Sequence, residues 1–225
     1  DAYIMSDKGQ KIVDFKLNNL HVVSYSEPID AIVSLEELDK HLHSMPDRPK
    51  AIPYITSYYE RNWGFSISHN QRQTLTPGNY RVVIDSTLEP GSMSYGELFI
   101  PGSDETEVFL STYICHPSMA NNEISGPVVA TALAKWLLSL DNTRHSYRFI
   151  FIPETIGSIL YLSRNLNRLK ERVIAGFNIT CVGDNLAHTY LASRKGDTLA
   201  DRVAKHVLGH IAPNYKTYSF LHRGS

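Results

Sequence analysis

The chain has 225 residues, and its 22 Lys and Arg side chains nearly balance 23 Asp and Glu side chains, giving a formal net charge of −1. This balance argues against a protein that binds the nucleic-acid backbone, because such a protein needs an excess of positive charge on at least one face. The apolar content of 42% is typical of a globular protein, and no apolar run approaches the ~20 residues of a membrane-spanning helix. We therefore expect neither a nucleic-acid partner nor a membrane partner.

Residues 1–104 contain short strand-like segments separated by turns. The predicted strands are 11–17, 20–25, 52–57, 63–68, 80–84 and 95–100. One helix is predicted to begin after Ser34, whose hydroxyl can cap the amide of Glu37. This part is expected to form a smaller, β-rich α+β domain.

Residues 105–225 alternate between apolar strands and amphipathic helices. The predicted strands are 108–114, 149–152 and 173–182, and helical spacing is found within 128–140, 156–166 and 199–208. Strands without polar alternation are covered on both faces, so this order predicts a doubly wound, mostly parallel α/β sheet. The chain starts at Asp1, not Met, and stops on a turn-like sequence, so we expect a fold that is incomplete at its C-terminus.

The two cysteines, Cys115 and Cys181, are too few for a disulfide scaffold. Both lie in apolar strand-like runs, so we expect buried thiols. This cysteine usage is typical of a reducing compartment, and we expect a cytoplasmic protein.

Polar side chains follow each of the three strands predicted in residues 105–225. His116 follows the first strand, Glu154 the second and Asp184 the third, while Glu123 precedes the first helix. In an open parallel sheet, ligands bind outside the carboxyl ends of the strands. Imidazole and carboxylate groups suit Zn²⁺, and a further carboxylate can act as general base. Each of these residues alone could also be a structural turn or helix-cap residue.

Two segments of this region carry a family resemblance. The strings STYICHPSMANNEISGP at residues 111–127 and PETIGS at 153–158 resemble bacterial aminopeptidase-like proteins of the DUF4910 type, distant relatives of the M28 zinc aminopeptidases. The strings SYY at 57–59 and WGFSISH at 63–69 resemble the DUF2172 domain that accompanies them. Together the resemblances extend over nearly the whole chain.

The resemblance implies a zinc-aminopeptidase-like fold and a zinc-dependent hydrolase. Such an enzyme cleaves a peptide or aminoacyl amide bond with metal-activated water. The family's first histidine ligand matches His116, its catalytic Glu matches Glu154, and a later Asp ligand matches Asp184. The segment with the metal-bridging carboxylate matches residues 121–123, where Glu123 is the preferred ligand. A further histidine ligand is implied beyond residue 225.

Three positions differ from the family pattern and keep a second hypothesis open. Ser118, Asn122 and Thr155 stand where related enzymes have carboxylates. The alternative is therefore a catalytically inactive aminopeptidase-fold binding or scaffold protein. A serine hydrolase is less favoured because Ser125-Gly126 lacks the Gly-x-Ser-x-Gly motif, and no Gly-x-Gly-x-x-Gly motif for a dinucleotide follows any predicted strand. The sequence leaves open whether the protein forms an oligomer.

Overall fold

The computed structural model describes residues 1–116 and 119–222, so Ser118 of the family pattern and the last residues of the chain lie outside the described part. The chain divides into two compact units, Asp1–Gly91 and Ser92–Ser225. The predicted boundary after residue 104 falls later in the chain. The strand at residues 96–100 pairs inside the second unit and so belongs with it.

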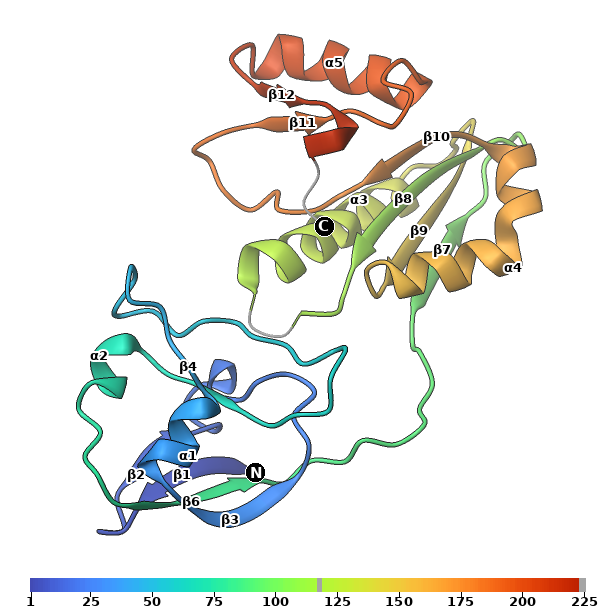
Figure 1. Cartoon of the computed structure of the whole chain (residues 1–225). Helices are drawn as coiled ribbons and strands as arrows, with labels where there is room; N and C mark the ends of the chain where they lie inside the picture. The colour runs from blue at the N-terminus through green and yellow to red at the C-terminus, as the bar shows by residue number, and fades with distance from the viewer. Residues whose placement is uncertain (117–118, 223–225) are drawn as a thin grey trace. The chain divides into compact units, whose positions relative to one another are not determined.

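The first unit is built on a four-stranded antiparallel sheet (Figure 1). Its strands, in the order in which they lie side by side, are β2 (Lys11–Asp14), β1 (Ala2–Ser6), β6 (Asn79–Ile84) and β3 (Ile29–Ser34). Ile4 of β1 and Val82 of β6 are register partners and are both buried. Leu38 of helix α1 (Leu35–Lys40) packs in the same core, so the helix is fixed by its apolar face.

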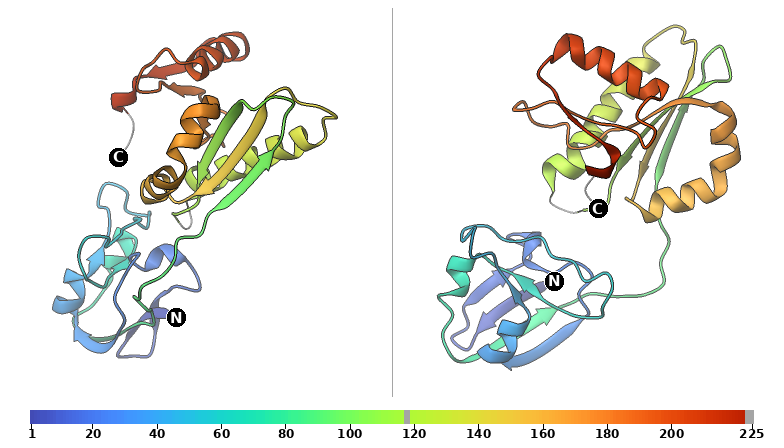
Figure 2. Two further views of the ribbon diagram at one scale, coloured as in Figure 1. Left: turned by 90° about the vertical axis from the view of Figure 1, so that its right-hand side faces the viewer. Right: turned by 45° about the horizontal axis from the view of Figure 1, so that its top comes forward.

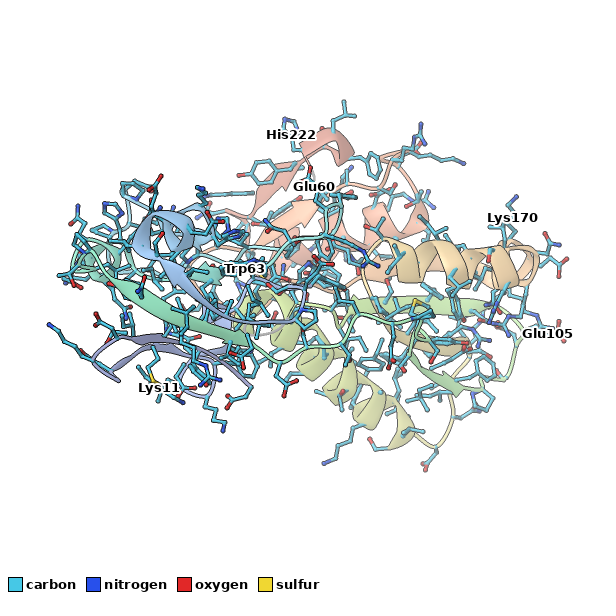
Figure 3. The ribbon with its side chains drawn as sticks, turned by 60° about the horizontal axis from the view of Figure 1, so that its bottom comes forward. Lys11, Glu60, Trp63, Glu105, Lys170 and His222 are labelled. Carbon is cyan, nitrogen blue, oxygen red and sulfur yellow. The ribbon has the colours of Figure 1, made fainter. Side chains whose placement is uncertain are left out.

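Helix α1 begins where the sequence predicts. Ser34 Oγ accepts a hydrogen bond from Glu37 N at 3.2 Å, which satisfies one of the free amides of the first turn. Shorter elements complete the unit, namely η1 (Asn19–His21), β4 (Leu42–His43), β5 (Phe65–Ser66) and α2 (His69–Arg72). Trp63, labelled in Figure 3, packs against the core and stacks on His41 with 3.7 Å between ring centroids.

Two strands predicted in this unit are replaced by irregular backbone. Residues 20–25 form part of η1 and isolated bridges, and residues 52–57 contribute only the bridge between Ser24 and Thr56. Their β-forming side chains satisfy the pattern of a strand, but no neighbouring strand pairs along their length. β1 and β3 are present although the sequence does not predict them.

The second unit has an α/β fold built on a sheet of mixed parallel and antiparallel strands (Figure 1). Its strand order is β10 (Val173–Asn178), β8 (Glu107–Tyr113), β9 (Ser146–Ile152) and β7 (Gly96–Ile100). β8 runs parallel to both β9 and β10, whereas β7 is antiparallel to β9. The carboxyl ends of β8, β9 and β10 therefore meet at one edge of the sheet.

Helices α3 (Ser125–Leu138) and α4 (Ile156–Arg172) cover opposite faces of this sheet (Figure 2). Ala134 of α3 shares a core with Phe149, and Tyr161 of α4 shares another core with Ile150. Since neighbouring residues of a strand point to opposite faces, Phe149 and Ile150 place the two helices on two sides. This is the arrangement of apolar strands covered on both faces.

The last elements of the unit are β11 (Thr189–Leu191), α5 (Leu199–Ile211), β12 (Lys216–Tyr218) and η3 (Phe220–His222). β11 and β12 pair in parallel. Thr198 caps α5 in a reciprocal capping box with Asp201, which fixes the start of the helix. Among the described residues, no helix combines the length and apolar character needed to cross a membrane.

Candidate functional site

The candidate site lies where β8, β9 and β10 end. His116 follows β8 and Glu154 follows β9, as the parallel order requires. The two exits are joined by a hydrogen bond from Ile114 N to Ile152 O at 3.2 Å. Strand pairing therefore continues to the edge of the site and fixes where both exit segments start.

Glu123 holds the imidazole of His116. His116 Nδ1 lies 2.8 Å from Glu123 Oε1, and the backbone amide of Cys115 donates to Glu123 Oε2 at 2.5 Å. The Glu123 side chain is only 9% exposed. It extends from the π-helical turn η2 (Ala120–Ile124), which lies just before α3. Both carboxylate oxygens thus have partners inside the site.

Glu154 stands on the other side of the same imidazole. Its Oε2 atom lies 3.8 Å from His116 Nε2, beyond the distance of a direct hydrogen bond, and its side chain is 41% exposed. Its backbone amide donates to Cys115 Sγ at 3.2 Å. The backbone of Glu154 is therefore anchored to the β8 exit, while its carboxylate remains accessible to water.

The residue after Glu154 has unusual backbone geometry. Thr155 has φ of 54° and ψ of −75°, and its side chain makes no cap hydrogen bond at the start of α4. A positive φ is a genuine outlier for a β-branched residue, and strained backbone is enriched at functional sites. The strain occurs at the turn that directs Glu154 out of β9.

Asp184 lies after β10 but outside this cluster. Its Oδ1 atom accepts hydrogen bonds from Leu186 N at 2.9 Å and Ala187 N at 3.3 Å, as in an Asx turn. The preceding loop is tied to η2 because Gly183 N donates to Asn121 Oδ1 at 2.8 Å. The structure therefore brings the loop to the site edge while the exposed Asp184 carboxylate caps its own turn.

Two further residues contribute to the site, and the sequence does not single them out. Cys115 Sγ lies 3.2 Å from His116 Nδ1, and burial raises the pKa of this thiol above its ordinary value. Tyr113 accepts a hydrogen bond from Asn122 Nδ2 at 3.3 Å, and burial likewise raises the pKa of its hydroxyl. The only available sequence signal is their position at the end of the predicted strand.

The two thiols differ in burial. Cys115 is half-buried, but Cys181 is exposed, so the prediction of a buried thiol is wrong for Cys181. β10 ends at Asn178, before the predicted end of that strand, and Cys181 lies in the loop with φ of 51°. An apolar run alone does not show where a strand leaves the sheet.

Asn122 occupies the position that the family resemblance assigns to a bridging carboxylate. Among the described residues, its Oδ1 atom is buried and has no hydrogen-bond partner. Its Nδ2 atom contacts Tyr113 OH and, at 3.8 Å, Cys181 Sγ. A neutral amide oxygen at this point supplies less negative charge to a cation than a carboxylate does.

The donor atoms of the site suit zinc. Imidazole nitrogen, cysteine sulfur and carboxylate oxygen are the three donor types that Zn²⁺ takes from proteins. One such atom from each of Cys115, His116 and Glu123 lies within 4.8 Å of the others. In the described part of the chain these three residues form the group with metal-ligand geometry, and Asp184 is not among them.

A distantly related solved structure has a similar fold. The chain is similar to BSAP, a zinc aminopeptidase from Bacillus subtilis, with a TM-score of 0.66, 12% identity, and coverage of 97% of this chain and 70% of that one. At this identity the likeness concerns the fold alone. The chain is thus an α/β protein whose fold is similar to that of a zinc aminopeptidase.

The chain belongs to the DUF4910 family, described as "Domain of unknown function (DUF4910)", whose family model matches residues 5–225. The matched range includes residues 57–59 and 63–69, the segments that resemble DUF2172. A Clostridium acetobutylicum protein named for polysaccharide biosynthesis and an aminopeptidase-like domain is 48% identical over all 225 residues. A crystal structure of a C. acetobutylicum protein described as a peptidase has a TM-score of 0.96 and 48% identity over 100% of this chain.

The chain spans about half the length of these relatives. It covers 51% of the curated C. acetobutylicum protein and 53% of the chain in the crystal structure. The relatives therefore contain additional residues that the described site does not include.

Proposed function

We propose that the protein is a zinc-dependent, aminopeptidase-like hydrolase that cleaves a peptide or aminoacyl amide bond, with Glu154 as general base. One observation carries this proposal. Glu154 Oε2 and His116 Nε2 face each other across 3.8 Å at the carboxyl ends of two adjacent parallel strands. This is where an open α/β sheet binds its ligand.

Glu154 is suited to move a proton. Because 3.8 Å exceeds a direct hydrogen bond, Oε2 is not occupied by the imidazole and can accept a proton from a water molecule beside it. The oxygen of that water then bonds to the scissile carbonyl carbon. Glu154 returns the proton to the amine nitrogen as the C–N bond breaks, so the base is regenerated.

Zinc belongs to this proposal because imidazole and carboxylate groups, which Zn²⁺ takes from proteins, follow the parallel strands. Bound zinc lowers the pKa of water towards ~7 and polarises a carbonyl oxygen. His116 is the proposed ligand from the described cluster, and the family resemblance implies Asp184 and, outside residues 1–225, a further histidine. Asp184 would bind through Oδ2, because its Oδ1 atom caps its own turn. Glu123, predicted from the sequence as a ligand, has both oxygens engaged in hydrogen bonds, and its role is derived below.

The proposed substrate has a free amine next to the amide bond that is cleaved. The likeness to the fold of a zinc aminopeptidase supports this class. One relative is named as a polysaccharide biosynthesis protein with an aminopeptidase-like domain, so aminoacyl amides of sugars are included among the test substrates.

The second candidate is a binding or scaffold protein that keeps the fold without turnover. Asn122 and Thr155 support it, because an amide and a hydroxyl stand where related enzymes place carboxylates. Ser118 supports it in the same way from its sequence position. The two candidates differ in one measurable respect, namely turnover that depends on Glu154.

The test combines zinc analysis with hydrolysis of aminoacyl anilides and aminoacyl sugar amides by the full-length protein. Glu154→Gln is expected to leave zinc content unchanged and to lower kcat by about 10²–10⁴-fold. Glu105→Gln is the matched control, because Glu105 is 87% exposed and lies away from the strand exits. No zinc above background, or turnover unchanged in Glu154→Gln, would overturn the proposal. Bound zinc without turnover would favour the scaffold.

A further inference from the structure

We propose that Glu123 is a positioning residue and not a zinc ligand: it fixes the tautomer and orientation of His116, so that Nε2 is the nitrogen that binds the metal. This inference rests on the proposed function for the identity of the metal. Its structural part, the tautomer of His116, stands on the geometry of the described residues alone.

Both carboxylate oxygens of Glu123 already have hydrogen-bond partners. Oε1 lies 2.8 Å from His116 Nδ1, and Oε2 accepts from the amide of Cys115 at 2.5 Å. A zinc ion bound through either oxygen would have to share that oxygen with a hydrogen bond that is already in place, or displace it. The side chain is 9% exposed, so water would not readily replace a displaced hydrogen bond.

The contact with Glu123 also determines which imidazole nitrogen carries the proton. An ionised carboxylate can only accept hydrogen bonds, so His116 Nδ1 must carry the proton that joins it to Glu123. In the neutral ring, Nε2 then holds the lone pair. This is the atom that faces Glu154 at 3.8 Å, so the tautomer fixed by Glu123 directs the lone pair towards the proposed base.

Glu123 itself is held in place. Its backbone amide donates to Met119 O at 2.7 Å, just before η2, and its side chain is anchored to the backbone at the end of β8. π-helical turns are rare in proteins, and those that occur are often found at functional sites. The carboxylate therefore reaches the imidazole from a turn that is tied to the strand exit.

The sequence explains why this chain needs such a residue. The family resemblance places the carboxylate that orients the first histidine two positions after it, where this chain has Ser118. Glu123, five residues after Ser118, supplies a carboxylate to the same imidazole. Partners of this kind change metal affinity by about 10–100-fold when they are replaced.

A rival arrangement uses the same atoms. Cys115 Sγ, His116 Nδ1 and a Glu123 oxygen lie within 4.8 Å of one another, so a cation could bind Nδ1 directly between the thiol and the carboxylate. In that arrangement Nδ1 carries no proton and Cys115 is a ligand. The two arrangements therefore predict opposite tautomers and a different role for the thiol.

The decisive experiment begins with metal-free, ¹⁵N-labelled protein at about pH 8, where an ordinary imidazole is neutral. Long-range ¹H–¹⁵N spectra are expected to show His116 protonated at Nδ1 and unprotonated at Nε2. Glu123→Gln is expected to disturb this state, because its amide has one acceptor for two donors. Glu123→Asp tests rescue of the tautomer by a shorter carboxylate, and Glu105→Gln is the control. An Nε2-protonated His116 in the unchanged protein would overturn the inference.

Metal binding supplies the second readout, measured with zinc and a competing chelator in full-length protein. Glu123→Gln is expected to raise the zinc Kd by about 10–100-fold, and His116→Ala to raise it further. With Co²⁺ in place of zinc, Cys115→Ser is expected to leave the absorption spectrum unchanged. A thiolate–cobalt charge-transfer band lost in Cys115→Ser would establish the rival site. If the unchanged protein binds no zinc, the proposed function fails while the tautomer result still decides the role of Glu123.

Discussion

Arg148 of β9 donates two parallel hydrogen bonds to Glu107 of β8, from Nε at 2.7 Å and from Nη2 at 3.0 Å. Arg148 is 5% exposed and Glu107 is 1% exposed, and Glu97 of β7 also contacts the guanidinium group. The hydrogen bond from Arg148 holds the pKa of Glu107 below its usual value. Three neighbouring strands of the sheet that carries the site are thus joined by one buried cation.

Removing one member of this pair should destabilise the protein strongly. Glu107→Gln leaves Arg148 without one buried countercharge, and breaking a buried ion pair costs about 3–5 kcal/mol of unfolding free energy. Urea denaturation measures the change. The control is Glu105→Gln, which removes the exposed partner of Arg172, 3.7 Å away, and should cost less than about 1 kcal/mol. Equal losses in the two variants would contradict this account.

Thr155 should gain stability when replaced by glycine. Its φ of 54° and ψ of −75° are strained for a β-branched residue and accessible to glycine, and its exposed side chain caps nothing. We expect Thr155→Gly to raise the free energy of unfolding by about 1 kcal/mol. Thr155→Ala is the matched control, since it removes the side chain but retains the strained Cβ.

The same pair of variants tests whether the strain serves Glu154. If the turn holds the carboxylate towards His116, Thr155→Gly should lower kcat although the protein is more stable. A Thr155→Gly protein that is less stable than the Thr155→Ala protein would contradict the interpretation of the backbone as strained.

The strand exits that form the candidate site are predictable from the sequence, but the contacts within it are not. Three apolar strands alternating with helices fix a parallel order, and that order alone brings His116 and Glu154 to one edge. Glu123 has a long side chain with several rotatable bonds, and it can reach either a metal or an imidazole. The structure shows its contact with the imidazole and the amide of Cys115 that anchors Oε2, and the proposed role of Glu123 rests on these two contacts.

Asp184 and the strand at residues 96–100 show the same limit. A carboxylate after a strand can point to a ligand or cap its own turn, and the choice depends on the loop conformation that Asn121 holds from another segment. Residues 96–100 have the pattern of a strand, but a pattern does not select the partner strand. Pairing with β9 places them in the second unit.

Gly126 should be intolerant of any side chain. A Cβ atom at this position would lie 2.3 Å from Ile179 O and 2.3 Å from Thr112 Oγ1, so the start of α3 approaches the sheet too closely for alanine. We expect Gly126→Ala to lower the free energy of unfolding by about 1–3 kcal/mol and to displace η2 with Glu123. Zinc affinity should fall in the same variant.

Gly209 of α5 provides the control for Gly126. Nothing lies within 4 Å of a Cβ built at this exposed helical position. Gly209→Ala should therefore stabilise the protein by about 0.5–1 kcal/mol, because alanine loses less backbone freedom in a helix. Destabilisation by Gly209→Ala would show that α5 packs differently at this position. Tolerance of Gly126→Ala would show the same for the start of α3.

Asp201 should make the stability of the protein depend on acidic pH. Burial of this 2% exposed residue would raise its pKa, but hydrogen bonds from Ser193, Thr198 and Tyr190 outweigh burial and hold the pKa of Asp201 well below its usual value of 3.8. A carboxyl group with a lowered folded-state pKa stabilises the protein fully above the unfolded-state pKa. The contribution is then lost as the pH falls from about 4 towards the folded-state pKa.

Asp201→Asn isolates this contribution because the amide keeps the shape of the side chain but does not titrate. The variant should be less stable than the unchanged protein at pH values above about 4, and the difference should shrink as the solution becomes more acidic. Urea denaturation followed at several pH values, with Asp141→Asn as an exposed carboxylate control, measures the difference. A gap between the curves that stays constant down to the lowest pH would mean that the Asp201 hydrogen bonds stabilise α5 through geometry alone, without the charge that the lowered pKa requires.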